Sequence, residues 1–145
     1  MQVKATTKIY GIFGHPVSHS LSPLMHNSAF SALGLDCVYT AFDVHPDDIG
    51  KAADAIRALG ISGVNVTIPH KQAIMPHLDE VSPDAKHTGA VNTVKNEGGR
   101  LTGYNTDVGG FMRDAREELG ISPEGARVLL LGAGGAARAV ISPGR

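Results

Sequence analysis

The sequence predicts an α/β fold in three layers, α/β/α, in which a mostly parallel sheet lies between helices. Short apolar runs alternate with segments whose apolar residues recur at helical spacing, and this alternation is typical of parallel βαβ units. The 145 residues fit one ordinary domain, and 18 Gly and 8 Pro suffice to end many short elements. A composition of 42% hydrophobic and 19% charged residues is that of a globular protein with a real core.

The first half of the chain is expected to contain five elements. Three apolar runs predict buried strands, and two amphipathic segments between them predict helices. In chain order, the strand, helix, strand, helix and strand cover residues 8–14, 22–33, 37–44, 46–59 and 61–66. Pro23 fits the first helical position behind Ser22, and Gly34 and Gly60 end the two helices. This order predicts neighbouring parallel strands.

The second half begins with two short helical pieces, one at residues 72–75 and one opened by Ser82-Pro83. Two strands, 91–95 and 100–104, flank the turn residues Asn-Glu-Gly-Gly and predict a hairpin. A helix then starts near Asp107 and stops at Gly120, and residues 127–131 form a strongly apolar run that predicts another strand. The composition suggests a domain junction at residues 121–125, so we expect domains over 1–120 and 121–145.

Charge and cysteine content exclude several classes of protein. A net charge of −1 and a pI near 6.6 provide no field that would attract nucleic acid or anionic lipid. The single Cys37 excludes an internal disulfide and fits a reducing compartment, where we expect it to be a buried small hydrophobe. No signal peptide and no apolar span of about twenty residues is present, so a cytoplasmic location is expected. The seven His residues lack ligand spacing, and no metal is expected.

Residues 65–71, Asn-Val-Thr-Ile-Pro-His-Lys, end the third predicted strand. Alternation sends the side chains of Asn65 and Thr67 to one side, Pro69 ends the strand, and Lys71 follows the bend. Ligands of open α/β sheets bind outside the carboxyl ends of strands, so an amide, a hydroxyl and an amine there suit a small polyhydroxylated ligand. The alternative is a strand end with ordinary turn residues.

Two serines precede the first helix. The hydroxyls of Ser20 and Ser22 lie at alternate positions near a helix amino terminus, where a carboxylate would meet donors and a favourable dipole. The alternative is that Ser22 only caps the helix, and in that case Ser20 would carry most of the ligand contact.

An amide and a carboxylate follow at later strand ends. Asn92 lies near the start of the hairpin, and Asp107 lies where its second strand gives way to a helix. Asp107 could pair with Lys71, and such a pair near an alcohol would position its proton and tune the amine for proton transfer. The alternative is an acidic residue that the helix dipole favours in the first turn.

The segment Gly132-Ala133-Gly134-Gly135-Ala136-Ala137 fits G-x-G-x-x-G/A after a predicted strand. Its glycines would allow a tight turn and close approach of a dinucleotide pyrophosphate. The motif requires a βαβ unit of about 30 residues and a ribose-binding group about 20 residues on, which would lie beyond Arg145. A Gly-rich tail is the alternative.

Together, these motifs resemble the shikimate dehydrogenase family. The motifs are Gly14-His15-Pro16, His19-Ser20-Leu21-Ser22-Pro23, His26-Asn27, residues 65–71, Ala90-Val91-Asn92-Thr93, Asn105-Thr106-Asp107 and residues 132–137. The resemblance implies an amino-terminal domain that binds shikimate and a carboxyl-terminal Rossmann domain that binds NADP. It further implies the reversible NADP-dependent oxidation of shikimate to 3-dehydroshikimate, with hydride passing across the cleft between the domains.

The resemblance also implies roles for single residues. Ser20 and Ser22 would hold the substrate carboxylate, and Lys71 would accept the proton with Asp107 as its partner. Ring hydroxyls would be bound by Asn65, Thr67, Asn92 and Asp107. The start of the NADP phosphate loop would consist of Gly132, Gly134, Gly135 and Ala136.

The chain leaves the family pattern near residues 141–145, where Pro143 would interrupt the helix after the glycine loop. We therefore expect a truncated gene product or a fragment that does not turn over shikimate by itself. The strand 127–131 would then have an unpaired edge, and it would be disordered or pair with a second copy in a homodimer. The competing hypotheses are a non-catalytic shikimate-binding protein and a quinate/shikimate dehydrogenase.

Overall fold

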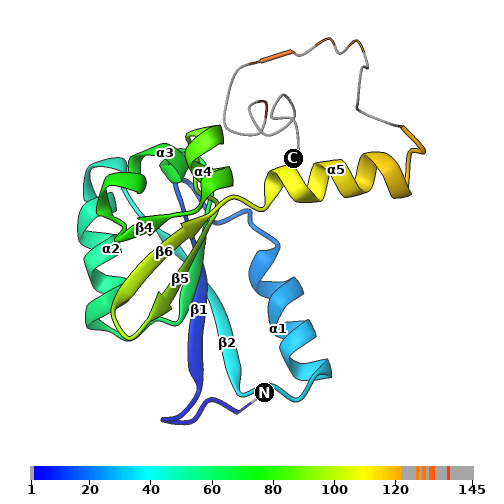
Figure 1. Ribbon diagram of the computed structural model, residues 1–145. Helices are drawn as coiled ribbons and strands as arrows, with labels where there is room; N and C mark the ends of the chain where they lie inside the picture. Colours follow the sequence, from blue (N-terminus) through cyan, green and yellow to red (C-terminus); the bar gives the residue numbers. More distant parts are fainter. Residues whose placement is uncertain (1, 122–126, 128, 130, 133–136, 138–145) are drawn as a thin grey trace.

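The computed structural model describes residues 2–121 and, beyond them, residues 127, 129, 131, 132 and 137. A six-stranded sheet forms its centre, with helices on both faces (Figure 1). The strands are β1 (Lys8–Gly14), β2 (Cys37–Asp43), β3 (Gly63–Val66), β4 (Glu80–Val81), β5 (Thr93–Glu97) and β6 (Arg100–Tyr104). The helices are α1 (Ser22–Ala32), η1 (Pro46–Asp48), α2 (Ile49–Ala58), α3 (His70–Ala73), η2 (Met75–His77), α4 (Pro83–Thr88) and α5 (Asp107–Glu117).

The strand order in the sheet is β2-β1-β3-β5-β6-β4. β1 is parallel to both β2 and β3, and β4 is parallel to β6. β5 is antiparallel to both of its neighbours, β3 and β6, so it alone among the six described strands runs in the opposite direction. The prediction of a mostly parallel α/β sheet is therefore confirmed, and the helices on its two faces form the predicted three layers.

The larger core lies between the sheet and α2. Ile49, Ala53 and Ile56 recur at helical spacing and are buried on one face of α2. Ile49 and Ile56 belong to one core with buried side chains of the strands, including Val94 and Leu101, which are 1% and 0% exposed. Each fully buried aliphatic side chain of this kind contributes about 1.5–3 kcal/mol through removal of apolar surface from water. This core attaches the hairpin β5–β6 to the parallel half of the sheet.

The second, smaller core lies under α1, on the opposite face of the sheet (Figure 1). Ile12 and Tyr39 are buried there, and Phe30 of α1 packs against them. α1 makes its main sheet contact with β2. Farther along the same face lies a cavity of about 270 Å³, and its walls include Tyr10, Tyr39, Asn65, Thr93, Lys95 and Tyr104.

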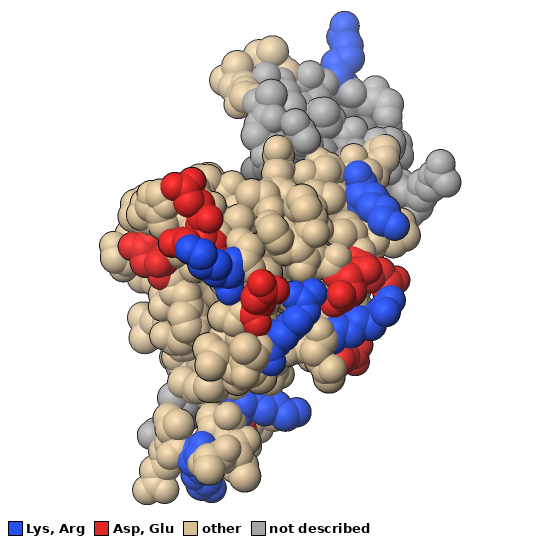
Figure 2. All heavy atoms as spheres, turned by 90° about the vertical axis from the view of Figure 1, so that its left-hand side faces the viewer, with Lys and Arg blue, Asp and Glu red and all other residues tan. Residues whose placement is uncertain are grey.

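Charged side chains of both signs are interspersed on the side of the molecule where α2 lies (Figure 2). Several form ion pairs, such as Arg57 with Asp79 at 3.0 Å and Arg100 with Glu80 at 3.1 Å. This face therefore has no field of one sign, in agreement with the small net charge. No helix in the described part of the chain has the length and apolar character needed to span a bilayer.

The predicted hairpin is present, but its first strand covers Thr93–Glu97 instead of residues 91–95, so Asn96 and Glu97 belong to the strand and not to the turn. β5 and β6 pair from Thr93–Tyr104 to Glu97–Arg100, which leaves a two-residue turn at Gly98 and Gly99. Both glycines have positive φ, 61° and 92°, as the tight turns that match the twist of a hairpin require. Residues with a Cβ adopt this backbone only with strain, so the glycines determine the register of the hairpin.

Several details differ from the sequence predictions. The first short helix covers His70–Ala73 instead of residues 72–75, and the predicted helix 46–59 is divided into η1 and α2. Strand β4 was not expected, because two residues are too few for a periodic signal and pairing with β6 alone defines it. Leu21, not Ser22, is the N-cap residue of α1, and the helix has no side-chain cap bond, so the capping role of Ser22 is wrong. Cys37 is half-buried where full burial was expected, because it begins a strand at the edge of the sheet.

The predicted strand 127–131 also differs in its described residues. Arg127, Leu129 and Leu131 are not in a strand, and the two leucines are 87% and 90% exposed. An apolar strand requires a neighbour that satisfies its backbone hydrogen bonds, and none of the six described strands pairs with these residues. The other two residues of this segment lie outside the described part of the chain.

Candidate functional site

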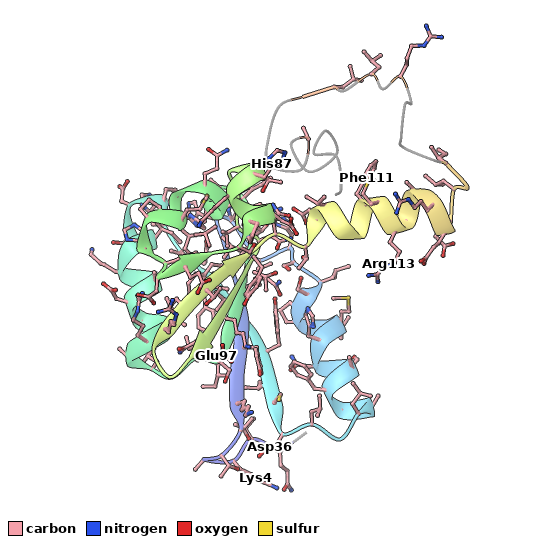
Figure 3. All side chains as sticks on the ribbon, viewed as in Figure 1. Lys4, Asp36, His87, Glu97, Phe111 and Arg113 are labelled. Atoms are coloured by element: carbon pink, nitrogen blue, oxygen red, sulfur yellow. The ribbon has the colours of Figure 1, made fainter. Side chains whose placement is uncertain are left out.

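Most of the predicted site residues lie at one end of the sheet. The carboxyl ends of β1, β3 and β6 point to this end, and so does the amino end of β5, because β5 runs in the opposite direction. In Figure 3 this end is at the top, where His87 and the start of α5 lie, whereas Asp36 and Glu97 mark the opposite end. The reversed strand explains how Asn92, just before β5, reaches the same edge as residues that follow parallel strands.

Lys71 and Asp107 form an ion pair, with 2.8 Å between Nζ and Oδ2. Their side chains are 20% and 32% exposed, so the pair is largely removed from water while one side remains accessible. Lys71 lies on α3, and Asp107 is the first residue of α5. The backbone N–H of Asp107 donates to Asn105 Oδ1 at 2.9 Å, which fixes the carboxylate at the start of its helix.

Asn92 orients the carboxylate from the other side. Its Nδ2 donates to Asp107 Oδ1 at 2.7 Å and to Thr106 Oγ1 at 2.9 Å, and its Oδ1 accepts from the Thr93 hydroxyl at 2.9 Å. The residue is 8% exposed. Both Nδ2 hydrogens thus go to protein acceptors, so a hydrogen bond from Asn92 to a ligand hydroxyl would replace one of these bonds.

Asn65 and Thr67 lie on β3 and directly after it. The Asn65 side chain accepts a hydrogen bond from the Tyr39 hydroxyl at 2.7 Å and donates to Thr93 Oγ1 at 3.3 Å. Thr67 packs its methyl group over Gly14, where an added Cβ would come within 2.6 Å of Thr67 Cγ2. Glycine at position 14 therefore allows β1 and the end of β3 to approach closely.

Ser20 and Ser22 are half-buried at the amino end of α1. The backbone N–H of Ser22 donates to Ser20 Oγ at 3.3 Å, so the two residues lie together as the sequence suggested. Within the described residues, the Ser22 hydroxyl makes no hydrogen bond. Because it does not cap the helix, it is available to a ligand.

Of the predicted nucleotide-binding residues, only Gly132 is described. Its φ of 112° lies in the region that favours glycine, which fits the tight turn at the start of a phosphate loop. Gly134, Gly135 and Ala136 lie outside the described residues. Among the described residues, no group of three or more His, Cys, Asp or Glu side chains could hold a metal ion.

Sequence reasoning did not assign Tyr39, Thr93 or Asn105 to the site. Asn105 is 6% exposed and donates to Thr88 Oγ1 and to the Ala90 carbonyl, both at 3.0 Å. These bonds tie the loop before β5 to the start of α5. An asparagine two residues before a helix is a recognisable capping signal, whereas the contacts of Tyr39 and Thr93 depend on strand order and have no local signal.

His70, next to Lys71, is a buried titratable group. It is 1% exposed, its Nε2 donates to the Val44 carbonyl at 2.8 Å, and Nδ1 has no partner among the described residues. Burial lowers the pKa of His70 from its ordinary value of 6.5, although the bond to Val44 opposes the shift. The folded protein therefore holds this imidazole neutral under conditions in which the unfolded chain binds a proton.

We expect the free energy of unfolding to fall as the pH is lowered from about 6.5 through the folded-state pKa of His70, because only the unfolded chain is then protonated. Above this range the ring is neutral in both states and contributes no pH dependence. His70→Phe should lose less stability than the wild type in urea titrations between about pH 7.5 and pH 5.5. His87→Phe, at an exposed position, is the control. An equal pH dependence in His70→Phe and wild type would contradict this role of His70.

Comparison with known proteins places the chain in a family. A family model described as the shikimate dehydrogenase substrate binding domain matches residues 12–94. The chain is 56% identical over 142 residues to the shikimate dehydrogenase (NADP(+)) of Geobacter metallireducens, which covers 98% of this chain and 50% of the relative. The chain spans about half the length of the curated relatives it matches.

Solved structures agree in fold. Shikimate dehydrogenase from Aquifex aeolicus has a TM-score of 0.88 and 46% identity, over 97% of this chain and 52% of that chain. Shikimate 5-dehydrogenase from Thermus thermophilus, solved in complex with NADP(H) and shikimate, has a TM-score of 0.84 and 46% identity, over 92% of this chain and 50% of that one. Since the family model covers more than half of the 145 residues, the chain belongs to the shikimate dehydrogenase family through its substrate binding domain.

Proposed function

We propose that residues 1–120 form the shikimate-binding domain of an NADP-dependent shikimate dehydrogenase, which oxidises shikimate reversibly to 3-dehydroshikimate. The observation that carries the proposal is the Lys71–Asp107 ion pair of 2.8 Å, with Asn92 on the second carboxylate oxygen at 2.7 Å. It combines an amine and an oriented carboxylate at the accessible end of the sheet. An alcohol placed there would meet a proton acceptor of fixed position.

The remaining polar groups suit the other parts of shikimate. The hydroxyls of Ser20 and Ser22, at the amino end of α1, would donate to its carboxylate. Its ring hydroxyls would be bound by Asn65, Thr67, Asn92 and Asp107. The substrate would thus be held by its carboxylate at one side and by its hydroxyls at the other. This orientation would determine the ring alcohol that faces Lys71.

Once Lys71 has lost the proton that it carries in the ion pair, its neutral Nζ would take the proton of that alcohol, which restores the ammonium group beside Asp107. NADP, when bound, would accept the hydride from the alcohol carbon. We assign residues 121–145 to the start of the NADP-binding domain, with Gly132, Gly134, Gly135 and Ala136 in its phosphate loop. The φ of 112° at Gly132 supports this assignment.

Two further parts of the proposal concern partner and location. A homodimer through residues 127–131 would bury Leu129 and Leu131, which are 87% and 90% exposed. Sedimentation at increasing protein concentration tests it, and a monomer at every concentration would contradict it.

The single half-buried Cys37 supports a cytoplasmic location, where thiols stay reduced.

Calorimetric titration of the 145-residue chain with shikimate tests the binding function. We expect saturable binding that Lys71→Ala weakens about 10-fold or more, because a hydrogen bond to a charged group contributes about 1.5–3 kcal/mol. Lys51→Ala is the matched control, since Lys51 lies on α2, is 84% exposed and pairs with Asp48 at 2.6 Å. Parallel titration with quinate separates the two substrates. Absence of saturable shikimate binding by the wild-type chain would contradict the proposal.

A further inference from the structure

Tyr39 is buried beside the site, although it belongs to none of the sequence motifs that predict the site. It lies on β2, is 4% exposed, and its hydroxyl donates to Asn65 Oδ1 at 2.7 Å. Burial raises the pKa of Tyr39 to about 12, so the phenol keeps its proton at physiological pH. The residue is therefore a permanent donor to Asn65.

The surroundings of Asn65 admit one orientation of its amide. Nδ2 faces the carbonyl oxygen of Asn92 at 3.4 Å and Thr93 Oγ1 at 3.3 Å. The Asn92 carbonyl can only accept, and it already accepts the backbone N–H of Val66 at 2.8 Å. Rotating the amide by half a turn would place Oδ1 against this carbonyl, so Oδ1 must face Tyr39.

A continuous series of hydrogen bonds runs from Tyr39 to the ion pair. After the bond from Asn65 to Thr93, the Thr93 hydroxyl donates to Asn92 Oδ1 at 2.9 Å. Asn92 Nδ2 then donates to Asp107, which holds Lys71 at 2.8 Å. Every bond from Tyr39 to Asp107 donates in the same direction, so the donor at Tyr39 is consistent with each orientation that follows, and Lys71 Nζ donates to Asp107 from the other side.

His26 and Asn27 hold Tyr39 in place. Asn27 Nδ2 donates to the Tyr39 carbonyl at 2.8 Å, and the Tyr39 N–H donates to Asn27 Oδ1 at 2.9 Å. The His26 ring stacks on the Tyr39 ring, with centroids 4.3 Å apart and 19° between the planes. Backbone and ring of Tyr39 are thus both fixed by α1.

We propose that Tyr39, clamped by His26 and Asn27, is a positioning residue that fixes the amide of Asn65 for the ring hydroxyl of the ligand. The orientation of Asn65 is a property of the free protein, whereas its effect on shikimate rests on the proposed function. These two consequences can be measured separately.

The first test needs no ligand. Tyr39→Phe keeps the ring and its stacking on His26 but removes the donor. We expect the side-chain NH₂ resonances of Asn65, assigned by their loss in Asn65→Asp, to shift and to exchange faster with solvent in Tyr39→Phe. Tyr10→Phe is the control, because Tyr10 lines the same cavity but makes no hydrogen bond to Asn65. Unchanged Asn65 resonances in Tyr39→Phe would overturn the inference.

The second test is a double-mutant cycle on shikimate affinity, measured by calorimetry. Tyr39→Phe should weaken binding about 5-fold, the net effect of one neutral hydrogen bond. In the Asn65→Ala background the same change should have no effect, because Tyr39 acts through Asn65. An equal loss in both backgrounds would overturn the inference, since it would indicate a general structural role. If wild-type protein binds no shikimate, the proposed function fails, and the resonances still decide whether Tyr39 orients Asn65.

Discussion

Replacing Lys71 by Met is expected to lower kcat for shikimate oxidation by about 10²–10⁴-fold, the usual contribution of a positioned proton acceptor. The measurement requires a complete nucleotide-binding half. A chimera that joins residues 1–120 of this chain to the remaining part of the Geobacter metallireducens relative, which is 56% identical over the matched 142 residues, supplies it. NADP reduction at saturating shikimate then reports kcat directly.

The size of this effect follows from the geometry around Lys71. Its Nζ lies 2.8 Å from Asp107 Oδ2 at a side-chain exposure of 20%, so water is a poor substitute for the missing amine. Met retains an unbranched side chain of similar length and can pack in the same space, so the loss is chemical rather than structural. Shikimate binding should weaken far less than turnover, because the serines and Asn65 remain.

Two controls separate the role of Lys71 from a general loss of charge. Lys51→Met removes an exposed amine from α2 and should leave kcat within about 2-fold, since exposed ion pairs contribute little. Asp107→Asn should lower kcat by itself. In the Lys71→Met background the same change should lower kcat little further, because the effects of residues that act as a unit are strongly non-additive. A kcat of Lys71→Met close to wild type would refute the proton-acceptor role.

The sequence allowed most of the fold to be predicted because its strands and helices have clear periodic patterns and glycine stops. β1 and β6 occur where expected, and α2 buries Ile49, Ala53 and Ile56 at helical spacing. β4 could not be predicted, because two residues carry no period and their pairing with β6 is a tertiary contact. The N-cap of α1 was assigned to Ser22 from residue preference, but the chain enters the helix one residue earlier, at Leu21.

In the candidate site, too, residues with a local sequence signal could be predicted, and residues whose contacts depend on tertiary structure could not. Lys71 and Asp107, 36 residues apart, were predicted to pair because both follow strand ends, and the structure places them 2.8 Å apart. Tyr39 was missed because its hydroxyl reaches Asn65 across the intervening strand β1, a contact that depends on the order β2-β1-β3. Strand order is set by long-range packing, so no pattern within β2 indicates the partner of its tyrosine.

The second large effect is expected at Leu101 in the core. Leu101→Ala should lower the free energy of unfolding by about 2–5 kcal/mol, because the side chain is 0% exposed and its removal leaves a cavity in close-packed surroundings. Since single domains are stable by only about 5–15 kcal/mol in total, this change alone should shift the urea midpoint strongly. Leu59→Ala, at a position 68% exposed, is the matched control and should change stability by about 0.5 kcal/mol or less.

Leu101 also tests whether the core and the site are separable. The side chain lies on β6 in the larger core, together with Val94 of β5 and Ile56 of α2. The hairpin that it anchors begins just after Asn92 and ends just before Asp107. The backbone N–H of Leu101 donates to Asp79 Oδ2 at 2.6 Å and is kept in the Ala variant. Shikimate affinity, corrected for the folded fraction, should therefore stay within about 3-fold of wild type while stability falls. If affinity of the folded molecules falls as steeply as in Lys71→Ala, the position of Asn92 and Asp107 depends on core packing, and the hydrogen bonds around them are insufficient to hold the site.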